Sequence, residues 1–342
     1  MLVLVSHGFF FTGRVDGIGR VGVNLFFFIS GILVFQSLAR MAAIPAWEKT
    51  GKFWMRRFRR LYPALLAYVL AMCPVAYLAQ NLRDLPPNHD FGSYLSTTPW
   101  VLAYLVNYRI ASAPMALGHL WSLACEMQFY LLSPLIVWLA GRYGIRKMIV
   151  FTIVLIMLTS LGLLQPILKA RFPVVGEWKY HFEFAVWPMM AGFYCEFQGE
   201  WLKRFPKVLL ETAYWLGIVA SLFGFVSMLA GKDAKNIVIA SGALLLGTCY
   251  VSYLSGRCFS RRTGTALKWL GERTYSIYLW QQPLTICGFL PYFLHPVGAV
   301  MATGFGAVWF NIFEQPFISK SRGKDISELT GRPVAKHTHQ FQ

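Results

Sequence analysis

The sequence predicts an all-α fold, a polytopic transmembrane bundle of about ten helices. Hydrophobic residues make up 56% of the 342-residue chain and charged residues only 14%, whereas a typical soluble domain is about 25% charged. The apolar residues are gathered into runs of about 20, the length that an α-helix needs to cross the hydrocarbon core of a bilayer. Together these observations exclude an ordinary soluble protein and predict one membrane domain over residues 1–342.

The apolar runs place the predicted helices along the chain. We expect them at about residues 1–12, 21–39, 61–80, 120–140, 148–165, 182–198, 208–229, 236–254, 274–291 and 297–317. The first run is short, because residues 1–11 would rise only about 16 Å as an α-helix. We therefore expect a truncated first helix or a partial span, and the apolar run lacks the basic start and small-residue cleavage pattern of a signal peptide.

The basic residues indicate how the helices are oriented. A net charge of +17 could point to nucleic acid, but the charges fall between apolar runs rather than on one soluble face. Most of the 32 lysines and arginines occupy alternate connections, starting with the segment from Arg40 to Arg60. Those connections are cytoplasmic under the positive-inside rule. We expect both termini, including a polar tail at 318–342, in the cytoplasm and no nucleic-acid partner.

The cysteines and the longest exterior connection give weaker evidence about function. The six cysteines are dispersed, without a CxxC pair, so we expect neither a metal site nor a disulfide framework. The longest exterior connection, 81–119, is rich in turn-forming residues. It could form a binding vestibule, or it could be a plain connector with a short interfacial helix near Trp100.

Ionisable residues inside apolar runs are functional candidates, because charge is costly at bilayer depth. His7 lies in the first run and Glu126 in the fourth, and further candidates are Glu183, Glu196, Asn311 and Glu314. A histidine can take a proton near neutral pH, and a carboxylate can orient it. Ser122 and Glu126 stand four residues apart on one helical face. We interpret His7 and Glu126 as a catalytic pair, against the alternative of hydrogen-bonded packing residues.

A cluster of arginines precedes the third predicted helix. Arg57 and Arg60 are three residues apart in FWMRRFRRLYP, so on a helical turn both guanidinium groups point the same way and could bind a phosphate. The alternatives are a nucleotide-like cofactor, an anionic lipid headgroup and ordinary cytoplasmic flanking charge.

Several segments, in this order, resemble the acyltransferase 3 family of integral membrane O-acyltransferases. They are VSHG around His7, GVNLFFFISGILV from Gly22, RRFRRLYP ending at Pro63, HLWSLACEMQFYLLSPL from His119, RTYSIYLWQQPL from Arg273 and FNIFEQPF from Phe310. The resemblance implies a bundle of about ten helices in a bacterial inner membrane. It also implies transfer of an acyl group, commonly acetyl from acetyl-CoA, to a hydroxyl of a glycan or lipid-linked glycan, which would modify a cell-surface polysaccharide.

The resemblance also implies roles for residues. His7 is similar to the family's first-helix general base, Glu126 to the acid of the WSL..E motif, and Arg57 and Arg60 to the pair that engages the phosphates of acyl-CoA. Three further residues are expected to support them: His119, Trp121 and Ser122.

Two positions depart from the family pattern. The family usually has an arginine about ten residues before the first-helix histidine, and this sequence begins only six residues before His7. The family also commonly has histidine where this chain has Gln281. Glutamine cannot act as a base, so we expect Gln281 only to form hydrogen bonds.

Two mechanisms and one other class of function are compatible with these residues. The acyl group could pass directly to the acceptor or through an acylated Ser6 or Ser122. A transporter or flippase of a lipid-linked or anionic substrate could instead use Glu126, Glu183 and His7 as a proton relay. The ordered sequence blocks favour the enzyme.

Overall fold

The computed structural model describes residues 16–40, 46–82, 90–144, 180–197, 204–229, 261–285 and 295–318, with isolated positions near 150 and 250. Within these ranges every regular element is helical and no strand occurs, which confirms the all-α class. The predicted helices 1–12, 148–165 and 236–254 lie wholly or mainly outside the described residues. So do His7 and nearly all of the predicted tail. The count of ten helices therefore stays a prediction.

In the described part, four helical segments are long and apolar enough to cross a membrane. They are Gly22–Ala39, Trp47–Asn81, Ala116–Tyr143 and Pro296–Ile318. They belong to α2 (Asp16–Ala39), α3 (Ala46–Leu82), α6 (Trp121–Tyr143) and α15 (His295–Trp309) with the π-helix η5 (Phe310–Glu314). The other described elements are α4 (Phe91–Leu102), η1 (Val106–Tyr108), η2 (Ile110–Ser112), α5 (Met115–Gly118), α9 (Phe182–Ala185), α10 (Trp187–Phe197), α12 (Lys207–Leu229) and α14 (Arg261–Thr285).

Two helices begin earlier than hydropathy predicts. α3 starts at Ala46 instead of residue 61, and α14 starts at Arg261 instead of residue 274. Both added stretches are rich in lysine and arginine, which are good helix formers, and Lys52 pairs with Glu48 one turn before it at 2.9 Å. Hydropathy marks where a helix leaves the apolar layer, whereas the backbone hydrogen bonds continue beyond it. The arginine cluster therefore lies on a helix.

The connection 81–119 contains a helix around Trp100, α4, and its position outside the membrane stays a prediction. Asp90 is the N-cap of α4, because its carboxylate accepts hydrogen bonds from the Ser93 amide at 3.3 Å and the Ser93 hydroxyl at 2.5 Å. The Ser93 hydroxyl bond holds the pKa of Asp90 below its ordinary value. η1, η2 and α5 then lead into α6.

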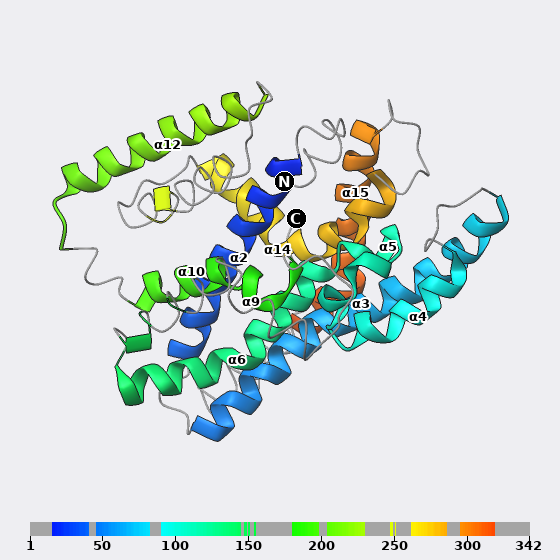
Figure 1. The fold of residues 1–342 in the computed structure, drawn as a ribbon, viewed down its shortest axis with the longest axis horizontal. Helices are drawn as coiled ribbons and strands as arrows, with labels where there is room; N and C mark the ends of the chain where they lie inside the picture. The colour runs from blue at the N-terminus through cyan, green and yellow to red at the C-terminus, as the bar shows by residue number, and fades with distance from the viewer. Residues whose placement is uncertain are drawn as a thin grey trace, which may run out of the picture.

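Most of the described helices lie beside one another in one bundle (Figure 1). α2 packs along α10 and α14 along α15, while α3 contacts α4, α6, α14 and η5. Figure 1 shows α12 along one edge, apart from α3 and α6. In the core, the Phe193 ring meets the edges of Phe35 and Phe129, with centroids 5.2 and 6.2 Å apart. The centre of the molecule is therefore fixed by ring packing between distant segments.

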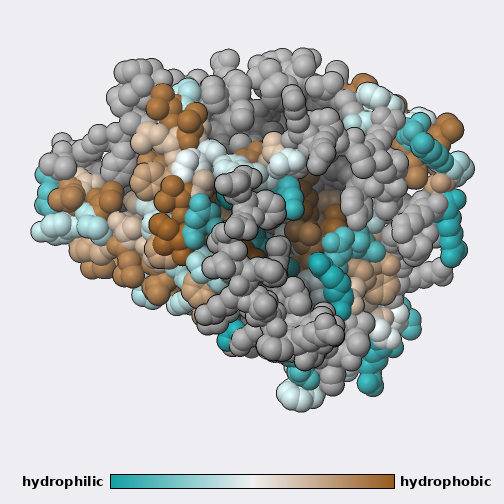
Figure 2. All heavy atoms as spheres, turned by 180° about the vertical axis from the view of Figure 1, so that it is seen from behind, coloured by the Kyte–Doolittle hydropathy of each residue, from teal (hydrophilic) through white to brown (hydrophobic). Residues whose placement is uncertain are grey.

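Large apolar side chains also cover much of the outer surface. Leu70 on α3, Trp138 on α6 and Val300 on α15 are 64%, 53% and 73% exposed. In the view of Figure 2, hydrophobic residues are prominent on the left part of the surface. Exposed apolar area on this scale is unfavourable in water and favourable in lipid. The surface agrees with a protein embedded in a membrane.

Two glycines let α2 and α10 approach closely. A Cβ atom at Gly31 would lie 2.0 Å from the Met189 carbonyl oxygen, and one at Gly192 would lie 2.0 Å from the Phe28 carbonyl oxygen. Small residues permit this backbone contact, which is typical of helix pairs in membranes. The contact requires that both positions stay without a side chain.

We expect Gly192→Ala to destabilise the protein by about 1–3 kcal/mol, because the added methyl group forces the two backbones apart. The control is Gly304→Ala on α15, where a Cβ atom would meet nothing within 4 Å. Thermal unfolding of the two variants in detergent checks the prediction. Equal melting temperatures for both would contradict the close packing of α2 and α10.

Candidate functional site

A cavity of about 570 Å³ lies between α2, α3, α6 and α14. Five residues that the sequence analysis selected line it: Arg57, Arg60, Ser122, Glu126 and Gln281. Apolar side chains of α2, including Val23, Phe26 and Leu33, line it as well. A volume of several hundred Å³, with mostly apolar walls and a few polar groups, is typical of small-molecule sites.

The Glu126 carboxylate is a buried polar centre of this cavity. The residue is 5% exposed, and its Oε1 atom accepts a hydrogen bond from the Ser30 hydroxyl at 2.5 Å. The Tyr130 hydroxyl donates to the same oxygen, and the Ser30 and Tyr130 hydroxyls are themselves 3.1 Å apart. A carboxyl group removed from water needs such partners. These contacts fix the carboxylate between α2 and α6.

Arg57 is held by aromatic rings. Its guanidinium carbon lies 4.7 Å from the centre of the Tyr130 ring and 5.6 Å from that of Phe53, distances at which a cation is attracted to the ring face. Because the Tyr130 hydroxyl also donates to Glu126, a single side chain contacts both the arginine and the carboxylate.

Arg60 has a different partner. Its Nε atom lies 3.8 Å from Oε2 of Glu314, and the Ser276 hydroxyl of α14 donates to Oε1 of the same carboxylate. Glu314 is fully buried at the end of the π-helix. The sequence analysis named it among the ionisable candidates and gave it no role.

Ser122 is part of a link between α6 and α14. Its hydroxyl donates to the Tyr278 hydroxyl at 2.8 Å, which donates in turn to the carbonyl oxygen of His119 at 2.9 Å. The Nε2 atom of His119 lies 3.1 Å from the carbonyl oxygen of Leu279. His119 therefore lies behind the cavity wall, whereas Ser122 is on it.

Trp121 and Gln281 occupy contrasting positions. Trp121 packs against the rings of Phe27 and Tyr180, with centroids 6.0 and 4.9 Å away, so it supports the fold beside the site. Gln281 lines the cavity while only 1% exposed. The position where the family commonly has histidine thus faces the site.

Three residues with a place at the site were missed from sequence: Ser30, Tyr130 and Tyr278. Ser30 is a hydroxyl inside the apolar run FFFISGILV, and Tyr130 stands four residues after Glu126, so both carried a signal. Tyr278 lies in the block RTYSIYLWQQPL that carries the resemblance, but its partner Ser122 could not be predicted, because the bond depends on contact between α6 and α14. His7 lies outside the described residues, and its contact with Glu126 stays a prediction.

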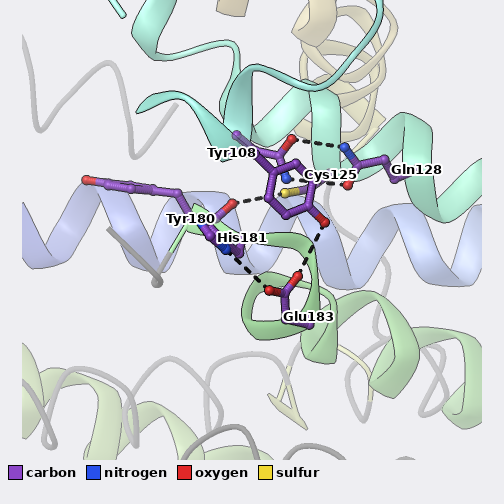
Figure 3. Close-up of polar contacts among 7 residues, drawn as sticks. Tyr108, Cys125, Gln128, Tyr180, His181 and Glu183 are labelled. Atoms are coloured by element: carbon purple, nitrogen blue, oxygen red, sulfur yellow. Dashed lines mark hydrogen bonds and ion pairs between the residues drawn. The ribbon is translucent and has the colours of Figure 1, made fainter. Parts of the chain in front are cut away.

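A second polar cluster lies against α6 (Figure 3). The Glu183 carboxylate accepts a hydrogen bond from the Tyr108 hydroxyl at 3.3 Å and lies 3.3 Å from Nδ1 of His181. Burial, followed by the charge of Glu183, raises the pKa of Tyr108, which keeps its proton. The Cys125 thiol donates to the carbonyl oxygen of Tyr180 at 3.5 Å. The cluster joins η1 of the connection 81–119 to α6 and α9.

Glu196, another of the ionisable candidates, lies between α10 and α2. Glu196 accepts a hydrogen bond from the Gln36 side chain at 3.0 Å, which ties α10 to α2. In the ranges that the structure describes, no three His, Cys, Asp or Glu side chains gather closely enough to hold a metal ion.

Similar proteins carry related descriptions. The chain is 28% identical to the peptidoglycan O-acetyltransferase OatA of Listeria monocytogenes over 78% of its length and 45% of that protein. It is 26% identical to the putative peptidoglycan O-acetyltransferase YrhL of Bacillus subtilis, over 78% of this chain and 44% of that one. It is 25% identical to a putative O-acetyltransferase of Staphylococcus aureus, over 92% and 54%.

The chain thus spans about half the length of the curated relatives it matches. No solved structure matches it. The family model Acyl_transf_3, described as an acyltransferase domain, matches residues 1–313, which is nearly the whole chain and includes every residue of the cavity. This protein therefore belongs to the acyltransferase 3 family.

Proposed function

We propose that the protein is a membrane O-acetyltransferase that moves an acetyl group from acetyl-CoA to a hydroxyl of a cell-surface glycan. One observation carries the proposal: a single cavity joins the arginine pair, an apolar wall and the buried Glu126 carboxylate. Such a cavity suits a donor with an anionic end and a long, weakly polar arm. The relatives described as peptidoglycan O-acetyltransferases support a glycan acceptor.

In the proposed reaction the phosphates of acetyl-CoA bind Arg57 and Arg60, and the pantetheine arm enters between the helices. The acceptor hydroxyl oxygen attacks the thioester carbonyl carbon, so that a C–O bond forms and the C–S bond breaks. His7, oriented by Glu126, takes the hydroxyl proton. The proton then passes to the departing sulfur, which releases free CoA. We place the donor on the cytoplasmic side and both chain termini there too, as the distribution of charge predicts.

The catalytic pair is tested by release of CoA. We expect wild-type protein, given acetyl-CoA and a membrane glycolipid, to release free thiol and acetylate the glycolipid. His7→Ala and Glu126→Gln should lower turnover by about 10²–10⁴-fold, the usual contribution of general acid–base catalysis. Thiol titration and mass spectrometry of the glycolipid measure both products. The transport alternative would be favoured if the wild-type protein moved the labelled acetyl group without forming an ester and if His7→Ala behaved in the same way.

The arginine pair is tested by Michaelis constants. We expect the double variant Arg57→Ala with Arg60→Ala to raise the KM for acetyl-CoA about 10- to 100-fold, because charged hydrogen bonds contribute about 1.5–3 kcal/mol. The KM for the acceptor should change little. Arg142→Ala is the matched control, since Arg142 rests on Trp138 at the end of α6 and is not among the cavity residues. If only the KM for the acceptor changed, the arginines would be assigned to acceptor binding instead of acetyl-CoA binding.

The link from Tyr130 to Glu126 is tested by removing one oxygen. Tyr130→Phe keeps the ring beneath Arg57 and deletes the hydroxyl that donates to Glu126. We expect turnover to fall about tenfold or more, as for the loss of a charged hydrogen bond, with the KM for acetyl-CoA nearly unchanged. Tyr143→Phe, at an exposed position of the same helix, is the control. A raised KM with normal turnover would show that the hydroxyl serves donor binding instead.

A further inference from the structure

Glu314 is a buried carboxylate with no role in the proposed reaction. It is 0% exposed, in a segment apolar enough to span a membrane, where an ionisable side chain is costly. It ends the π-helix Phe310–Glu314, an element that often marks functional positions. Its neighbours Asn311, Ile312 and Gln315 are exposed, so this turn directs the glutamate inward.

The two oxygens of Glu314 contact two different helices. Oε1 accepts the hydrogen bond from Ser276 on α14, and Oε2 lies 3.8 Å from Nε of Arg60 on α3. The Ser276 side chain is fully buried. One end of the carboxylate is thus anchored inside the protein, and the other end faces an arginine of the cavity.

Arg60 is the more exposed member of this pair. Its side chain is 35% exposed, against 0% for Glu314, and it lines the cavity. A guanidinium that faces one carboxylate through Nε keeps its terminal nitrogens for a second anion. Arg57, three residues earlier, is a like charge on the same helical face and repels Arg60. The negative charge of Glu314, next to Arg60, offsets that repulsion.

We propose that Glu314 is a positioning residue, which holds Arg60 in the orientation that binds a phosphate group of the donor. The inference rests on the proposed use of acetyl-CoA. An arginine fixed before binding loses less side-chain freedom when the phosphate arrives, and the affinity for the donor rises accordingly. Arg57, which rests on the Tyr130 and Phe53 rings, does not depend on Glu314 for its position.

The test is a double-mutant cycle on the full chain in membranes. We expect Glu314→Gln to raise the KM for acetyl-CoA about tenfold, as for a lost charged interaction, and to leave kcat and the acceptor KM within about twofold. In an Arg60→Ala background the same substitution should have no further effect on KM, because coupled residues are not additive. In an Arg57→Ala background the full effect should persist. Glu48→Gln, which removes an exposed partner of Lys52 on α3, is the control.

Two outcomes would overturn the inference. An unchanged donor KM in Glu314→Gln would do so, and so would an equal increase with and without Arg60. If Glu314→Gln fails to fold, Ser276→Ala tests the inference instead, because it removes only the hydrogen bond to Oε1 of Glu314. We expect Ser276→Ala to raise the KM for acetyl-CoA by a smaller factor. That increase should again disappear in an Arg60→Ala background. A wild-type protein that does not consume acetyl-CoA would defeat the proposed function itself, which separates the two failures.

Discussion

The structure depends on keeping carboxylates buried inside an apolar bundle. A carboxyl group that leaves water must find hydrogen bonds or countercharges within the protein, and few polar side chains are available among these helices. Glu126 and Glu314 solve the problem in the same way. Each accepts a hydrogen bond from a serine on another helix, Ser30 on α2 and Ser276 on α14. Each carboxylate thereby fixes how two helices meet.

The same carboxylates organise the positive charge of the cavity. Arg57 and Arg60 carry like charges and repel each other. Each therefore needs a nearby group that stabilises its positive charge. Arg57 lies over the ring whose hydroxyl donates to Glu126, and Arg60 lies against Glu314. The two arginines are thus tied to two separate carboxylates through different chemistry. This arrangement keeps both cations on the cavity wall before any ligand arrives, which is the condition for binding a polyanion without a large rearrangement.

Sequence reasoning reached the class of fold and much of the site. Apolar runs located α2 and α6 to within a few residues, and Arg57 and Arg60, which their spacing places on one helical face, both line the cavity. Hydropathy did not predict where α3 and α14 begin. Both helices extend beyond their apolar runs, because the lysines and arginines before those runs are good helix formers. The partners of the carboxylates were beyond reach. Ser30 and Glu126 are 96 residues apart, and no local pattern encodes which turn of α2 faces α6.

Close packing completes the link between fold and site. Gly31 follows Ser30, and its backbone lies so near Met189 of α10 that a Cβ atom has no room. The distance between α2 and α10 is therefore set by direct backbone contact. That distance also influences where the Ser30 hydroxyl meets Glu126, because Ser30 and Gly31 are carried by the same helix. The Glu126 carboxylate that lines the cavity is thus placed partly by the glycine next to its serine partner on α2, and the sequence block around Gly31 serves packing and chemistry at once.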